Sequence, residues 1–152
     1  MIGTSIGGGS GTIAAREFQR WCAAVGDHNP LYFDAAVARD HGYRDIIAPP
    51  LYLQHCLDTV RFLEDLAADG TPRGADSIPL PHTPRLMAGG DSWEFHAVAY
   101  PGDRITSGIR LLDIQQKQGR SGPFLLITWR TTYTNQHEQL VAVSDETMLA
   151  RP

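Results

Sequence analysis

The spacing of apolar side chains changes half-way along this sequence, and that change constrains the fold more than any other feature. In the first half they recur every three or four residues, which predicts amphipathic helices. From Trp93 onward they alternate with polar residues, which predicts strands. The helices are expected over residues 14–25, 34–41 and 51–67, and the strands over 93–99, 105–114, 124–133 and 140–149. Helices followed by consecutive strands favour an α+β fold, in which an antiparallel meander packs one face on the most apolar helix, 51–67.

Glycine and proline mark the ends of these segments. Gly26 ends the first helix in the usual C-terminal place. Pro49-Pro50 opens the third helix, because proline is tolerated in a first turn. Residues 3–11 are rich in glycine but complete neither a dinucleotide-binding nor a P-loop fingerprint, so a flexible loop is expected there. Residues 69–91, rich in glycine and proline, predict a long loop of the kind that is usually functional or mobile.

Charge and composition exclude several classes of protein. The 152 residues carry a formal net charge of -4 with scattered Lys and Arg, so broad contact with nucleic acid is not expected. No apolar run approaches the roughly 18 residues that cross a bilayer, and no signal peptide opens the chain. Cys22 and Cys56 fall on apolar helix faces and are expected to be core side chains, which favours a reducing cytoplasm. The length suits one domain over residues 1–152.

Two groups of short motifs stand out in combination. The first is Gly-Asp-His-Asn-Pro-Leu-Tyr-Phe-Asp at 26–34, followed by Ala38, Gly42, Ile47 and Ala48-Pro49-Pro50. The second comprises residues 84–90, 93–96, 101–103 and 119–123. Together they cover nearly the whole chain and resemble the MaoC-like hydratases and dehydratases. Within that group the chain is similar to fungal-FAS-like dehydratase half-domains, to mycobacterial hydroxyacyl dehydratase subunits and to mesaconyl-CoA hydratase relatives.

The resemblance implies a fold, a partner and a substrate class. The fold is a hot-dog domain, a sheet wrapped around a long central helix, for which residues 51–67 are the candidate. Two such domains pair, as a homodimer, a heterodimer or a tandem repeat. The substrates are acyl thioesters of CoA or of an acyl carrier protein, and the reaction is reversible addition of water to a trans-2-enoyl bond. That reaction needs no metal, nicotinamide or flavin, and the sequence shows no signature of one.

The chain keeps only part of the catalytic set that the family uses. Water addition needs a base, a group that orients the water and a donor for the developing enolate oxygen. Asp27 stands where the family has its Asp, and Asn29 matches the Asn that shapes the turn. Tyr32 replaces the expected His, and a phenol with a pKa near 10 is a poor base at neutral pH. Pro49-Pro50 replaces a His-Gly pair, and proline has no N–H to donate.

The first hypothesis is therefore a non-catalytic subunit that supplies an acyl-binding surface to a second hot-dog subunit carrying the His. Two alternatives stay open. The chain can act alone as a homodimer, with Asp27 as base, Tyr32 as a hydroxyl donor and His28 or another histidine as helper. It can also be a thioester-binding module without any dehydratase partner.

Candidate site residues carry plainer interpretations beside the functional ones. Asp27 can simply cap its turn, Tyr32 can be a half-buried aromatic, and Asp34 is expected to N-cap the helix that follows. The basic turn with Lys117 and Arg120 is a candidate for phosphates of CoA or pantetheine, and equally for a solvated hairpin tip. The histidines have no metal-site spacing. The full set of substrate-binding candidates is Asn29, Pro49, Pro50, Tyr52, Arg85, Gly89 and Arg120.

Overall fold

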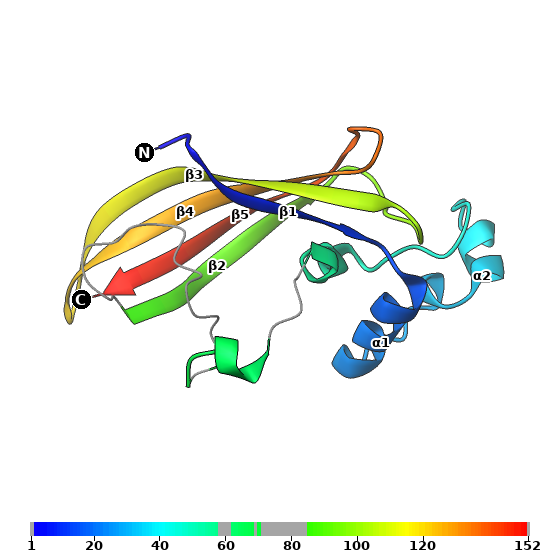
Figure 1. Ribbon diagram of the computed structural model, residues 1–152, viewed down its shortest axis with the longest axis horizontal. Helices are drawn as coiled ribbons and strands as arrows, with labels where there is room; N and C mark the ends of the chain where they lie inside the picture. The colour runs from blue at the N-terminus through cyan, green and yellow to red at the C-terminus, as the bar shows by residue number, and fades with distance from the viewer. Residues whose placement is uncertain (1, 58–61, 69, 71–84, 152) are drawn as a thin grey trace.

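A five-stranded antiparallel sheet forms the body of the protein (Figure 1). The computed structural model describes residues 2–57, 62–68, 70 and 85–151. The spatial order of the strands is β1-β3-β4-β5-β2. Their bounds are Ser5–Thr12 for β1, Arg85–Phe95 for β2, Arg104–Gly119 for β3, Gly122–Thr134 for β4 and Leu140–Arg151 for β5.

Two α-helices lie at one end of this sheet, on the right in Figure 1. They are α1, Ala15–Val25, and α2, Ala35–Asp40, and both confirm the prediction from spacing. Gly26 ends α1 at a φ of 74°, a left-handed conformation that glycine adopts without strain. Asp34 caps α2 as expected, since its carboxylate accepts from the N–H groups of Ala36 and Val37.

The glycine-rich segment expected to be a flexible loop is a strand, and that prediction is wrong. β1 pairs with β3 in an antiparallel register that runs from Ser5 opposite Arg110 to Thr12 opposite Arg104. Its glycines carry no side chains, so they leave no alternating pattern in the sequence for the strand signal to use. Because glycine has no Cβ, β1 can pack closely against η3. A Cβ on Gly11 would overlap the main-chain oxygen of Cys56.

The described residues between 51 and 67 do not form the continuous central helix that the sequence predicts. They make short 3-10 turns: η2 Pro50–Leu53, η3 His55–Leu57 and, beyond residues 58–61, which lie outside the described part, η4 Leu63–Asp65. Apolar positions at i and i+3 fit a 3-10 turn as well as an α-helix, so the spacing did not decide between them. Two apolar residues in the second half of the expected helix are exposed, Phe62 at 66% and Leu63 at 89%.

The strand connections differ from a simple meander of four consecutive strands. β3, β4 and β5 do form a meander, but β2 pairs with β5 and not with β3. The edge of β3 is already occupied by β1, so the far edge of β5 is the one left for β2. Residues 85–91, expected in the long loop, belong to β2, whereas residues 69 and 71–84 of that loop lie outside the described part. β2 ends at Phe95, earlier than the alternation to Ala99 predicted.

The core lies on one face of the sheet, which we call the inner face: the face that carries the buried side chains of Ile105, Ser107, Tyr133, Ala142 and Ser144. α1 and the turn η2 pack against the end of this face through a cluster that also contains Phe18, Cys22, Tyr52 and Leu53. Cys22 is buried, as expected, and Cys56 is half-buried in η3. A second, smaller cluster around Leu111, Ile127 and Ala150 lies further along the sheet.

Candidate functional site

The turn between α1 and α2 holds the first candidate residues. The Asp27 carboxylate accepts from the backbone N–H of Asn29 at 3.0 Å, and the Asn29 side chain accepts from the N–H of Leu31 at 3.1 Å. These two side-chain turns lead the chain into η1, Pro30–Tyr32. Asp27 therefore caps its turn in the structure, as the plainer interpretation expects. Asp27 keeps its second carboxylate oxygen for any further role.

Tyr32 is buried at the end of this turn, with 7% of its surface exposed. Burial raises the pKa of its phenol above the ordinary value of 10.0, and the nearby Asp27 carboxylate raises it further. A hydrogen bond with the Asn29 side chain acts in the opposite direction on this pKa without cancelling the rise. The phenol therefore stays protonated at neutral pH and can donate a hydrogen bond, but it cannot take a proton from water.

Pro49 and Pro50 lie where the chain enters η2. The backbone just before them is fixed by two long-range bonds, from Ile47 N–H to the Leu31 carbonyl at 3.1 Å and from Ala48 N–H to the Ala99 carbonyl at 2.8 Å. The first bond ties this segment to the turn that carries Tyr32. Because both prolines lack an N–H, neither can donate to an enolate oxygen, and the first backbone donor of η2 is the N–H of Leu51.

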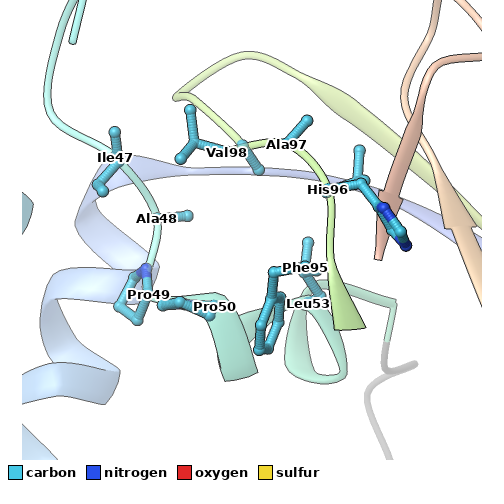
Figure 2. Close-up of a pocket in the computed structure, with 11 residues that line it drawn as sticks. Ile47, Ala48, Pro49, Pro50, Leu53, Phe95, His96, Ala97 and Val98 are labelled. Atoms are coloured by element: carbon cyan, nitrogen blue, oxygen red, sulfur yellow. The ribbon is translucent and has the colours of Figure 1, made fainter. Parts of the chain in front are cut away.

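A pocket of about 310 Å³ opens beside these prolines (Figure 2). The segment 47–53 forms one wall and residues 95–99, just beyond the end of β2, form the other. The lining is apolar apart from His96, whose ring points away from the prolines in Figure 2 and lies 3.8 Å from the Glu94 carboxylate. The lining residues are Ile47, Ala48, Pro49, Pro50, Leu53, Phe95, His96, Ala97, Val98, Ala99 and Val141.

The structure brings only part of the predicted set to this pocket. Pro49 and Pro50 line it, whereas Asp27, Asn29 and Tyr32 lie in the neighbouring turn. Tyr52 packs in the core, with its ring 5.9 Å from that of Phe18. Burial also raises the pKa of its phenol.

The remaining candidates lie away from the pocket: Arg85 at the opposite end of β2, Gly89 near the middle of that strand and Arg120 in the turn between β3 and β4. Arg85 begins the strand and pairs with Arg151, and Gly89 sits at a bulge in the same strand. Arg120 is at the tip of the β3–β4 hairpin, next to Ser121, which accepts from Arg151 at 2.6 Å. β2 has eleven residues, so its two ends are about 30 Å apart at ~3.3 Å per residue. The basic residues thus form a cluster of their own, away from the pocket.

Sequence reasoning missed one whole wall of the pocket. Residues 95–99 continued the alternating pattern of a strand, so nothing in the sequence distinguished them from sheet core. In the structure the N–H groups of His96 and Ala97 both donate to the Val141 carbonyl, at 2.9 and 3.2 Å, which ends the regular ladder. The position of this wall therefore depends on the path of the backbone after the end of β2, which the periodicity of the sequence does not predict.

Two further site types find no support in the described part of the chain. None of its groups of His, Cys, Asp and Glu has three members placed to hold a metal ion. None of its helices is both long and apolar enough to span a bilayer.

Comparison with known proteins decides the family. Residues 1–144 match the family model described as "FAS1-like, dehydratase domain region". The chain belongs to this FAS1-like dehydratase family. The match covers both groups of motifs and confirms the resemblance to MaoC-like enzymes. Among curated relatives of this dehydratase-family chain is a probable enoyl-CoA hydratase alpha subunit from Thermomonospora curvata, 29% identical over 133 residues. That match spans 82% of this chain and 40% of the relative, so the chain covers less than half of that protein's length.

Solved structures share the fold of this dehydratase-family chain. The ChsH1-ChsH2 complex from Mycobacterium tuberculosis contains a chain that matches with a TM-score of 0.75 and 20% identity, covering 95% of this chain and 83% of that one. The R-hydratase PhaJ1 from Pseudomonas aeruginosa matches with a TM-score of 0.67 and 20% identity, covering 99% of this chain and 82% of that one. The hot-dog fold and its α+β class are thereby confirmed.

Proposed function

We propose that this chain is the acyl-binding, non-catalytic subunit of a heteromeric enoyl-thioester hydratase or 3-hydroxyacyl-thioester dehydratase. The observation that carries the proposal is the apolar pocket that opens at Pro49 and Pro50, where His96, the one ionisable side chain among the described lining residues, points away from the prolines. Such a pocket can hold an acyl chain, but it cannot by itself activate water.

The neighbouring turn supports the same conclusion. Tyr32 stands at the position of the family's His and holds its proton, because its phenol pKa is raised. Asp27 remains, but its carboxylate already accepts from the Asn29 N–H. A complete site therefore requires a His and an enolate donor from a second hot-dog subunit.

Two comparisons are consistent with such a partnership. The Thermomonospora curvata relative is described as an alpha subunit, and the Mycobacterium tuberculosis structure is a complex of two named components. For this chain we expect the partner to be a hot-dog protein that retains the Asp and His pair. The thioester is one of CoA or of an acyl carrier protein, in the cytoplasm.

Hydration assays on three preparations test the proposal: the chain alone, the candidate catalytic subunit alone and the two co-purified. Each is given trans-2-enoyl-CoA and the matching enoyl carrier protein, and loss of the enoyl-thioester absorbance is followed. We expect robust turnover only in the co-purified complex. Robust turnover by the chain alone would overturn the subunit role, and Asp27→Asn would then show whether Asp27 is the base of a homodimer.

A fourth preparation, the complex that carries Tyr32→Phe in this chain, tests whether this chain takes part in the chemistry or only binds its partner. In the complex, Tyr32→Phe removes the phenol and keeps the ring, so we expect kcat to change less than threefold. A loss of more than about a hundredfold, on the scale of a removed general acid or base, would show that Tyr32 takes part in the chemistry. Acyl-CoA binding without turnover in any preparation would instead favour a thioester-binding module.

A further inference from the structure

The described residues that line the pocket beside Pro49 and Pro50 are apolar apart from His96. We propose that this pocket takes an unsubstituted hydrocarbon acyl chain of short to medium length and rejects acyl groups that carry a second carboxylate. We further propose that Phe95 and Ala97 set the accepted length. This inference rests on the proposed acyl-thioester function and names its substrate class.

The first argument concerns charge. Among the described residues that line the pocket, His96 is the one ionisable side chain, and its ring points away from the prolines and approaches Glu94. The guanidinium carbon of Arg44 lies 4.1 Å from the centre of the Tyr100 ring, and Arg44 forms an ion pair with the Asp103 carboxylate. A second carboxylate on the acyl group would lose its water without gaining a cation, and an unpaired charge is costly to bury.

The second argument concerns hydrogen-bond donors. The N–H groups of Ile47, Ala48, His96 and Ala97 are already bonded to main-chain carbonyls of other segments. Pro49 and Pro50 have no N–H at all. These four N–H groups and the two prolines are therefore not available as donors to a polar substituent on the acyl chain.

The third argument concerns size. A volume of about 310 Å³ is at the lower end of the ~300–1,000 Å³ found for small-molecule pockets. Ala48, Ala97 and Ala99 keep the space open, and Phe95 narrows it. Figure 2 shows the ring of Phe95 beside Leu53, across the pocket from Pro49 and Pro50. Phe95 is 46% exposed, so its truncation enlarges the pocket without removing a buried core side chain.

A matched pair of four-carbon thioesters tests the charge argument. Crotonyl-CoA and fumaryl-CoA share the reacting enoyl bond and differ in a methyl group against a carboxylate. With the active assembly we expect kcat/KM for fumaryl-CoA to be lower by about a hundredfold, the order that an unpaired buried polar group produces. Equal kcat/KM for the two substrates would overturn the inference.

A homologous series from four to twelve carbons tests the size argument. Up to the limit of the pocket, kcat/KM should rise about fourfold per methylene, the fold-change that corresponds to about 0.8 kcal/mol per buried CH₂. Phe95→Ala should move that limit to longer chains. Ala97→Leu should lower kcat/KM at least tenfold for the longest accepted chain and less than threefold for crotonyl-CoA.

The control is Met87→Ala, which truncates another exposed apolar residue of β2 at the end away from the pocket. It should leave the chain-length profile unchanged. An unaltered profile in both Phe95→Ala and Ala97→Leu would overturn the role of these residues. Calorimetric binding of saturated acyl-CoAs should give the same ranking without catalysis. Binding that follows the expected ranking without any turnover would therefore contradict the proposed function alone, and turnover with a chain-length profile that neither Phe95→Ala nor Ala97→Leu alters would contradict this inference alone.

Discussion

Replacing Gly11 with alanine probes the packing of β1 against the turn η3. A Cβ on Gly11 would overlap the main-chain oxygen of Cys56, and a main-chain atom cannot move aside as a side chain can. The matched control is Gly9→Ala, two residues earlier on the same strand. There the added Cβ would lie 3.7 Å from the Leu57 oxygen, an ordinary van der Waals contact.

The two substitutions therefore have very different expected costs. Overpacking that displaces backbone costs about 1–3 kcal/mol and occasionally more, so we expect Gly11→Ala to lose about 3 kcal/mol. In a domain of this size each kcal/mol lowers Tm by about 2–4 °C, which gives a decrease of roughly 6–12 °C. Gly9→Ala should stay within about 0.5 kcal/mol of the parent, because the reduced freedom of the unfolded chain offsets any small contact cost.

Urea and thermal unfolding at one fixed protein concentration measure both variants. The pair shares the residue change, the strand and the partner strand, so strand propensity cancels in the comparison. Equal unfolding midpoints for the two variants would refute the reasoning, because they would mean that β1 does not lie against residues 56–57.

Three further predictions concern buried or paired carboxylates. Burial raises the pKa of Glu146, a hydrogen bond with Trp129 lowers it by less, and Asp91 opposite raises it further, so its ionised form opposes folding at neutral pH. Glu146→Gln should raise the urea midpoint at pH 7, and the gain should vanish as the pH falls to about 4.5, the ordinary pKa of the group. Asp145 has its pKa lowered by hydrogen bonds from Arg130, so its stabilisation is present above pH 3.8 and is lost as the pH falls through the lowered pKa. Asp145→Asn should cost less than about 1 kcal/mol at pH 7, because the pair is partly exposed. Asp103, which is 6% exposed, accepts from Tyr100 N–H and the Gln136 amide at 2.8 and 3.0 Å. Asp103→Ala should lower the unfolding free energy by about 3 kcal/mol, and a loss below 1 kcal/mol in urea titration would contradict this role.

The role of Asp103 also shows how a motif residue can belong to the scaffold. Pro101-Gly102-Asp103 was part of the family resemblance. In the structure the Asp103 carbonyl accepts from Ile13 N–H at 2.9 Å, and Gly102 N–H donates to the Ile13 carbonyl at 2.8 Å. This turn therefore joins the end of β1 to the start of β3. Its position in the family pattern is explained by architecture without any contact to the pocket.

Sequence alone determined the features that depend on nearest neighbours or on residue type. α1 and α2 were predicted because apolar spacing, a left-handed glycine at 26 and the Asp34 cap are local signals. The chemical limits of Tyr32 and of Pro49-Pro50 were equally visible, since no fold gives a phenol the basicity of an imidazole or gives proline an N–H.

Tertiary structure decided what depends on segments that are far apart in the chain. β1 became a strand because glycines without side chains fit between β3 and η3, a contact that hydrophobic spacing does not record. β2 joined β5 because the edge of β3 was occupied. The pocket arose where residues 47–53, 95–99 and Val141 converge. Each of these features is set by packing between distant residues, and local periodicity carries no information about which distant residues will meet.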